Sequence, residues 1–155
     1  MSGFEKRRIL VAVDGSEAAW AALRVGLELG TALGCGTIAV TAIQTRMPGY
    51  RAGYFSFVDR HILDELRTQA GAVLEEARRR AAEMNAPLET QTLEGEGEIY
   101  TQLVELLGKT EGVCFLVLGS YGHGLRDRHL LGSTTQRLIV EIARRELKVP
   151  VLVVP

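Results

Sequence analysis

Short apolar segments of strand length alternate with longer segments of helical period along the whole 155-residue chain. The apolar segments cover residues 9–13, 37–43, 88–93, 113–118 and 149–154, and the helical ones run over about 17–33, 56–85, 98–107 and 134–146. This alternation is typical of a parallel sheet whose strands are joined by crossover helices. Residues 113–118 are apolar throughout, which indicates a central strand covered on both faces.

Five strands and four helices wound with right-handed crossovers predict a doubly wound, Rossmann-like α/β fold, with helices on both faces of a five-stranded parallel sheet of order 3-2-1-4-5. Residues 1–155 are expected to form one domain. In this order strands one and four flank the switch point, where their exit loops open a crevice. Those loops begin Asp14-Gly15-Ser16 and Gly119-Ser120-Tyr121-Gly122. The sequence therefore predicts a binding site where two distant turns converge.

The charges are nearly balanced, with 18 Lys plus Arg against 19 Asp plus Glu and a net charge of -1. We therefore expect no general attraction to nucleic acid or anionic lipid. The longest apolar stretches are about a third of the length that spans a bilayer, so a soluble protein with no membrane partner is expected. Two cysteines, Cys35 and Cys114, are too few for a disulfide framework, and a reducing cytoplasm fits them best.

The exit of the fourth strand reads Gly119-x-x-Gly122, nine residues, then Gly132-Ser133 at the start of a helix. Glycines allow positive φ and leave backbone amides accessible, while Ser133 and Thr134 supply hydroxyls and the helix start supplies a positive dipole end. Together these features are typical of a cradle for a phosphate chain. Each glycine alone also fits an ordinary turn, whereas the complete spacing between a buried strand and a helix is more specific.

Two further features each leave two interpretations open. Asp14 either caps the helix that follows it or contacts a ligand. The ligand contact would be a hydrogen bond accepted from a ribose hydroxyl or a contact with a metal through water. Residues 44–57 form a long irregular stretch that either covers the crevice or packs on a second subunit, and a capping box at Ser56 and Asp59 predicts the start of the next helix. The three histidines, at 61, 123 and 129, lack metal-ligand spacing, so no metal site is expected.

The glycine spacing, with Val11-Ala12-Val13-Asp14-Gly15-Ser16 near the start and Pro150-Val151-Leu152-Val153-Val154 at the end, resembles the universal stress protein family over essentially the whole chain. Members that keep this spacing bind ATP, so the resemblance implies that this chain binds ATP, with or without Mg²⁺. The resemblance implies that Asp14 and the backbone at Ala12 lie near the adenosine and that the backbone around Ala42 reads the adenine edge. The residues implied to hold the ribose and phosphates are Gly119, Gly122, Gly132, Ser133, Thr134 and Thr135.

The residues that an efficient ATPase needs are missing from the pattern. Leu131 and Gly132, rather than a lysine, precede Ser133, and no Ser-His-Asp or Cys-His arrangement occurs at a suitable loop. No G-x-G-x-x-G follows the first strand, which disfavours a dinucleotide oxidoreductase. We therefore assign no catalytic residue and expect ATP to be bound far better than it is hydrolysed.

The terminal strand, Val149 to Val154, is a hydrophobic edge that a second copy would cover by antiparallel pairing, as the resemblance also implies. The leading interpretation is thus a cytoplasmic, homodimeric, ATP-binding regulatory module of the stress response. Two alternatives stay open: a slow ATPase or phosphotransferase using Asp14 with a divalent cation, and a dimeric scaffold that binds no nucleotide.

Overall fold

A computed structural model of the chain describes residues 7–46, 52–121 and 131–155, with residues 52–59 described by their backbone alone. The strands are β1 (Arg8–Ala12), β2 (Gly36–Gln44), β3 (Glu89–Gly95), β4 (Val113–Gly119) and β5 (Val151–Val154), and the helices are α2 (Glu17–Leu33), α3 (Ala52–Glu83), α4 (Ile99–Lys109) and α5 (Ser133–Arg144). The strands pair in parallel in the order β3-β2-β1-β4-β5. The predicted fold class and strand order are confirmed.

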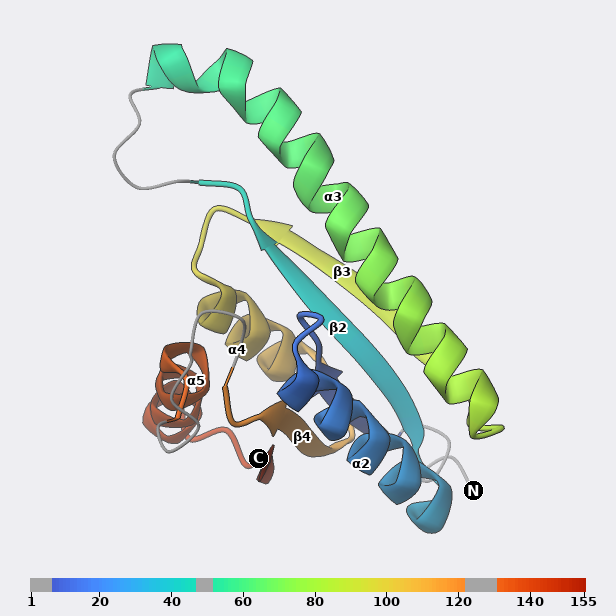
Figure 1. Cartoon of the computed structure of the whole chain (residues 1–155). Coiled ribbons are helices and arrows are strands. Elements are labelled where there is room, and N and C mark those ends of the chain that lie inside the picture. The colour runs from blue at the N-terminus through green and yellow to red at the C-terminus, as the bar shows by residue number, and fades with distance from the viewer. Residues whose placement is uncertain (1–6, 47–51, 122–130) are drawn as a thin grey trace.

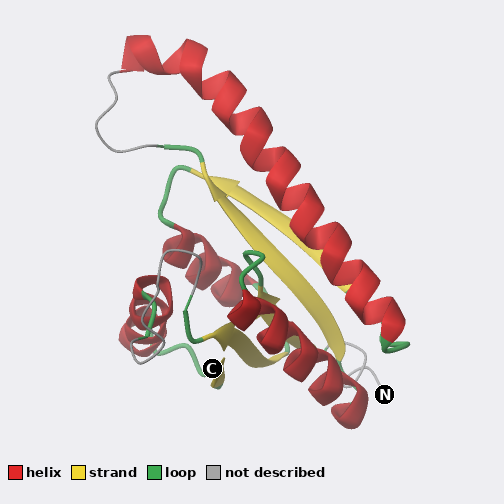
Figure 2. Ribbon diagram, viewed as in Figure 1, coloured by secondary structure: helices red, strands yellow, loops and turns green. Residues whose placement is uncertain are grey.

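Helices cover both faces of the twisted sheet (Figures 1 and 2). Ile9 and Val11 of β1 pack with α2 and α3 on one face, whereas Leu10 packs with α4 and α5 on the other. Successive side chains of a strand point to opposite faces, so each central strand contributes to two apolar clusters. This burial on both sides explains why the central strands are continuously apolar in sequence.

Helix α2 begins and ends where its sequence signals predict. Ser16 is the N-cap, and its hydroxyl accepts a hydrogen bond from the Ala19 N–H at 3.2 Å. Gly34 ends the helix in the left-handed conformation, with φ at 69°. Gly26 lies on the buried face, where a Cβ would stand only 2.5 Å from Cγ2 of Val11. The helix therefore lies unusually close to β1.

The predicted boundary before α3 is wrong. Strand β2 continues to Gln44 and α3 begins at Ala52, so much of the expected irregular stretch 44–57 is strand or helix. The backbone of Ser56 lies inside the helix rather than at its N-cap. A Ser-x-x-Asp pattern also occurs within helices, and a short pattern cannot distinguish the two positions. Residues 47–51 and the side chains of 52–59 lie outside the described structure, so the two roles considered for them stay untested.

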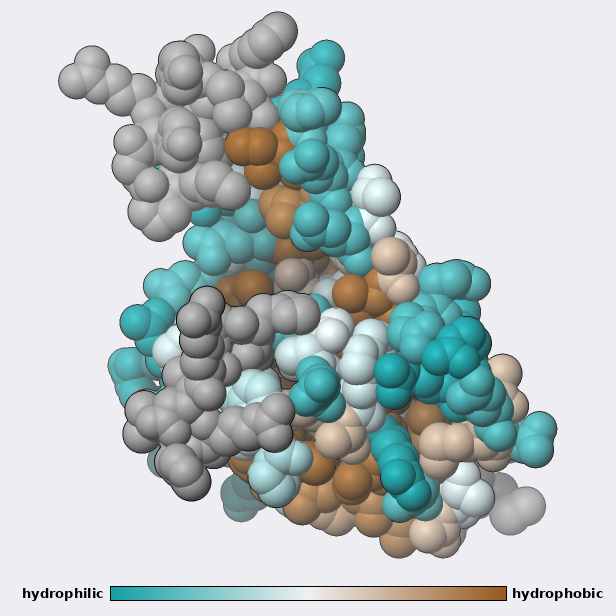
Figure 3. All heavy atoms as spheres, in the orientation of Figure 1, coloured by the Kyte–Doolittle hydropathy of each residue, from teal (hydrophilic) through white to brown (hydrophobic). Residues whose placement is uncertain are grey.

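Helix α3 is amphipathic rather than apolar. Ala70, Leu74, Ala77 and Ala81 recur at helical spacing and are buried against the sheet. Hydrophilic residues cover its outer side, as Figure 3 shows. Within the described ranges, no helix combines the length and the apolar composition that crossing a membrane requires.

Candidate functional site

The crevice at the carboxyl ends of the strands arises because β2 extends beyond the end of β1. The pairing of β1 with β2 ends at Ala12 and Val40, and the Val13 N–H donates to the Val40 carbonyl at 2.8 Å. The pairing of β2 with β3 continues four residues further, to Gln44. The other edge of β2, from residue 41 onward, therefore faces the loop that follows β1. This is the switch point that the strand order predicts.

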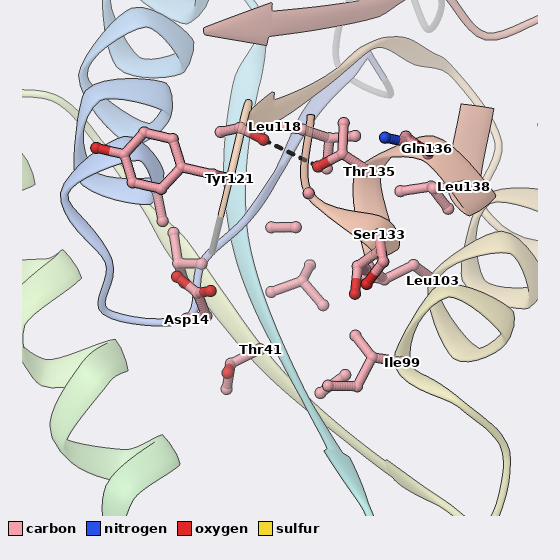
Figure 4. A pocket seen from close by; sticks show the side chains of 18 of the residues that line it. Asp14, Thr41, Ile99, Leu103, Leu118, Tyr121, Ser133, Thr135, Gln136 and Leu138 are labelled. Atoms are coloured by element: carbon pink, nitrogen blue, oxygen red, sulfur yellow. Dashed lines mark hydrogen bonds between the residues drawn. The ribbon is translucent and has the colours of Figure 1, made fainter. Parts of the chain in front are cut away.

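A cavity of about 580 Å³ opens at this point, a size within the range of small-molecule sites. It is lined by every predicted site residue of the described ranges, namely Ala12, Asp14, Ala42, Gly119, Gly132, Ser133, Thr134 and Thr135. Gly122 lies outside the described residues. Residues about a hundred positions apart in sequence thus converge on one cavity, as the fold predicts (Figure 4).

Asp14 lies in the loop after β1 at one side of the cavity, and Ser133 lies at the other (Figure 4). The Asp14 carboxylate accepts a hydrogen bond from the Ser16 N–H at 2.9 Å through Oδ1, which closes the turn before α2. Ser16, not Asp14, supplies the helix cap. Asp14 is exposed. Its carboxylate therefore closes the turn before α2 and is also accessible from the cavity.

Helix α5 starts at the cavity with no side-chain cap. Its N-cap is Gly132, which has no side chain to bond the first N–H groups of the helix. The Gly132 N–H donates to the Ser120 carbonyl at 2.7 Å, and Thr135 Oγ1 donates to the Gly119 carbonyl at 3.0 Å, the bond dashed in Figure 4. These bonds hold the helix start against the end of β4. The arrangement suits an anion, because uncapped N–H groups and the helix dipole both favour negative charge.

Neither Gly119 nor Gly132 has the positive φ that was one predicted reason for the glycines of the motif. Gly132 has φ at -61°, and Gly119 is not among the described glycines with positive φ, so neither needs left-handed backbone. A Cβ at Gly119 would stand 2.7 Å from the carbonyl carbon of Ala18 in the first turn of α2. Gly119 is therefore required for close packing of α2 against β4, which brings Asp14 and the α5 terminus to one cavity.

Sequence reasoning missed the apolar wall of the cavity. Ile99 and Leu103 of α4 line it, together with Tyr121, Leu131 and Leu138. Gln102, which is 8% exposed, donates from Nε2 to the carbonyl of Ile43 at 3.0 Å and to that of Gly97 at 2.9 Å. It thereby ties the turn before α4 to the end of β2 and positions Ile99. No motif marks these residues, although the strand order places the β3 exit beside the crevice.

Helix α3 borders a second hollow of about 340 Å³, which shares Asp14, Thr41, Ala42 and Ile99 with the main cavity. An ion pair outside the hollow ties α3 to β3: Arg67 donates to both carboxylate oxygens of Glu94, at 2.6 and 3.0 Å. The hydrogen bond from Arg67 holds the pKa of Glu94 below its ordinary value. Glu94, near the end of β3, is thus held in an ion pair with α3.

The described lining limits the chemistry of the cavity. Asp14 is its one charged residue there, and none of the lining residues in the described ranges is His, Cys or Lys. Across the same ranges, no three His, Cys, Asp or Glu side chains gather as a metal site would require. The cavity combines an uncapped helix terminus suited to an anion, a carboxylate and an open strand edge, which together fit a ligand with a phosphate and a polar, planar part.

Comparison with known proteins agrees with the fold. The universal stress protein family matches residues 6–155. The universal stress protein UspA from Lactobacillus plantarum is 21% identical, with 97% of this chain and 99% of that chain covered and a TM-score of 0.82. A universal stress protein from Archaeoglobus fulgidus in complex with dAMP is 20% identical, covering 96% and 98%, with a TM-score of 0.69.

A universal stress protein in complex with cAMP is also similar, at 24% identity, 97% coverage of both chains and a TM-score of 0.63. No match was found among curated proteins. Because the family match extends over nearly the whole chain, which also has the expected sheet order, the chain belongs to the universal stress protein family.

Proposed function

We propose that this chain binds ATP in the cavity between β1, β2, β4 and α5 and acts as a homodimeric, cytoplasmic regulatory module of the stress response. The observation that carries the proposal is the convergence of three features on one cavity of about 580 Å³. These are the uncapped terminus of α5, the Asp14 carboxylate and the open edge of β2. They match the phosphate, ribose and base of a nucleotide in turn.

The phosphates are assigned to the start of α5. Its first N–H groups lack a side-chain cap, and the exposed hydroxyls of Ser133 and Thr134 stand beside them. A helix terminus of this kind binds phosphate through directed N–H groups and its dipole. We assign Gly119, Gly122 and Gly132 to the same phosphate-binding loop, with Thr135 holding the helix start in place through its bond to Gly119.

The adenosine is assigned to the opposite side, where Ala12 and Asp14 follow β1 and Ala42 lies on the open edge of β2. Backbone groups on a strand edge are suited to the hydrogen-bonding edge of a base, and the apolar side chains of Ile99 and Leu103 are suited to its face. The two relatives solved with dAMP and cAMP support an adenine nucleotide as the ligand class.

Hydrolysis is expected to be slow. A catalyst must stabilise the transition state more strongly than bound ATP, which usually requires a lysine, an arginine or a metal at the phosphates. Asp14 is the one charged group of the described lining, so among the described residues a divalent cation would meet a single carboxylate there. We therefore propose ATP occupancy, rather than turnover, as the signal that the protein presents.

Purified protein is expected to bind one ATP per chain saturably in calorimetry, and to carry adenine nucleotide through native purification in mass spectrometry. Single-turnover hydrolysis is expected to be slower than about one per second, near the lower end of ordinary enzyme rates. Faster turnover that is lost in Asp14→Asn would establish the ATPase alternative. Absence of binding to both ATP and AMP would leave a scaffold without a nucleotide.

The proposed dimer interface is the free edge of β5. The Leu116 N–H donates to the carbonyl of Pro150 and the Ser120 N–H to that of Val154, so the even-numbered residues of β5 face β4. Val151 and Val153 consequently present their backbone groups to the outer edge. In Figure 3 hydrophobic residues gather at the lower edge of the molecule, where Figure 1 places β4, β5 and the lower part of α2. Such an edge favours pairing with a second copy.

Val153→Pro is expected to convert the dimer into a monomer in analytical ultracentrifugation, because proline removes an outward N–H and leaves the bonds to β4 in place. Val153→Thr is the matched control, since it keeps the branched side chain and the N–H. A Val153→Pro protein that sediments like the Val153→Thr protein would place the interface elsewhere.

A further inference from the structure

Two free thiols meet at the end of the sheet opposite the cavity. Cys35 directly precedes β2 and Cys114 is the second residue of β4, so both lie at the amino ends of their strands. Their Sγ atoms are 3.6 Å apart, although the residues are 79 positions apart in sequence. The sulfurs are therefore in contact but are not bonded, since a disulfide bond measures about 2.05 Å.

A β-bulge brings the two sulfurs together. Arg8 pairs with Val113 and Ile9 pairs with Phe115, so Cys114 is the extra residue between two consecutive pairs. Cys114, Phe115 and Val117 all pack on the face covered by α2 and α3. Regular alternation counted back from Val117 would turn Cys114 to the opposite face. The bulge instead places it on the face where Cys35 is buried.

The two thiols have different access to solvent. Cys35 is 8% exposed and packs in the apolar cluster, whereas Cys114 is partly exposed. Burial raises the pKa of the Cys35 thiol, and the hydrogen bond with Cys114 adds to this effect, while the positive charge of Arg7 opposes it. A small oxidant in water therefore reaches Cys114 first, and Cys35 lies within contact distance to react next.

The backbone around each cysteine allows the two sulfur atoms to move to bonding distance. The sulfurs must come about 1.5 Å closer to bond. Gly34 and Gly36 flank Cys35, and Gly112 lies two residues before Cys114, with φ of 69° at Gly34 and 74° at Gly112. Cys35 thus lies at a chain turn just before β2, and Cys114 lies at the bulge after the first pair of β4 with β1. A small local shift there leaves the centre of the sheet in place.

We infer that Cys35 and Cys114 form a reversible oxidation site that reduces a hydroperoxide and becomes an intramolecular disulfide. The Cys114 thiolate attacks the peroxide, the O–O bond breaks, and a sulfenic acid and an alcohol or water result. Cys35 then attacks the Cys114 sulfur, the S–S bond forms, and the S–O bond breaks with release of water. With hydrogen peroxide, two thiols lose two electrons and two protons, and two molecules of water form.

Treatment of the reduced full-length protein with hydrogen peroxide tests this site. The intact mass should fall by two hydrogens, the count of alkylatable thiols should fall from two to zero, and a peptide containing both cysteines should appear and disappear on reduction. The melting temperature should rise by roughly 5–15 °C on oxidation, because the bond constrains a long loop in the unfolded chain. ATP is not needed for any of these measurements, so they stand whether or not the cavity binds nucleotide.

The single-cysteine variants separate the two roles. In Cys35→Ser, Cys114 should gain one or more oxygen atoms, because no second thiol traps its sulfenic acid. In Cys114→Ser, the thiol of Cys35 should react with peroxide at least about tenfold more slowly than Cys114 does, because it is buried. The inference would be overturned by a wild-type protein that keeps both thiols, adds oxygen at Cys114 while Cys35 stays alkylatable, or links only between two molecules.

Discussion

Gly119→Ala is expected to lower the free energy of unfolding by about 2–4 kcal/mol, because the added methyl group would overlap with atoms of α2. It would stand 2.7 Å from the carbonyl carbon, 2.8 Å from Cβ and 2.9 Å from the carbonyl oxygen of Ala18. These atoms belong to the first turn of α2, so relief requires the helix to move as a body. Urea denaturation of the variant and the wild type measures the change.

Gly71→Ala is the matched control, since it adds the same methyl group with the opposite expected sign. Gly71 lies within α3, and a Cβ there meets no atom within 4 Å. Alanine is the better helix former, so this variant should gain about 0.5–1 kcal/mol. Two variants that change stability alike would show that the contact with Ala18 does not determine the effect at Gly119.

The clash between residue 119 and Ala18 is also expected to change the geometry of the cavity. Residue 119 lies at the end of β4, and Ala18 lies four residues after Asp14. A displaced α2 carries with it the turn that Asp14 closes through the Ser16 N–H. Gly119→Ala should therefore weaken ATP binding in addition to lowering stability, although no other residue of the cavity lining is altered.

The sheet order could be predicted because it depends on patterns that local chemistry determines. Strand and helix periods differ, crossovers between parallel strands are right-handed, and a strand buried on both faces must be apolar. The segment at 113–118 meets that last condition, and in the structure it is an interior strand between β1 and β5. Caps are equally local, because a serine hydroxyl and a glycine with positive φ act within one helix turn, as Ser16 and Gly34 do at the ends of α2.

What could not be predicted depends on packing between distant segments. Gln102 reads as an ordinary polar helix residue until the fold brings the Ile43 carbonyl to its side chain. Cys114 lies within a continuously apolar segment of the sequence, whereas in the structure it is the extra residue of a bulge and lies partly exposed beside Cys35. A bulge changes the face of one residue without altering the apolar pattern, so no periodicity reveals it.

The glycine motif is a case where the location was predicted and the physical reason was not. Its spacing identified residues that line one cavity, as far as the described ranges extend. Positive φ was one of the two predicted reasons, but Gly132 has φ at -61°, and at Gly119 the nearby atoms of Ala18 leave no room for a side chain. The sequence shows that residue 119 is a glycine. Only the structure shows that atoms of Ala18 occupy the space that a side chain would need.

Ser133→Asp is expected to weaken ATP binding by at least about 30-fold relative to Ser133→Asn, as measured by calorimetry, because the new carboxylate lies where the phosphates are assigned. The fold itself should not suffer. An acidic residue in the first turn of α5 interacts favourably with the helix dipole, which stabilises the protein by about 0.3–1 kcal/mol.

The opposite signs of these two effects make the pair of variants decisive. A substitution that merely damaged the protein would lower stability and affinity together, whereas charge at an anion-binding terminus raises one and lowers the other. Asparagine keeps the size and polarity of aspartate, so the comparison isolates one negative charge. Equal ATP affinities for the two variants would show that the phosphates do not bind at the start of α5. The proposed function would then lose the contact on which the phosphate assignment rests.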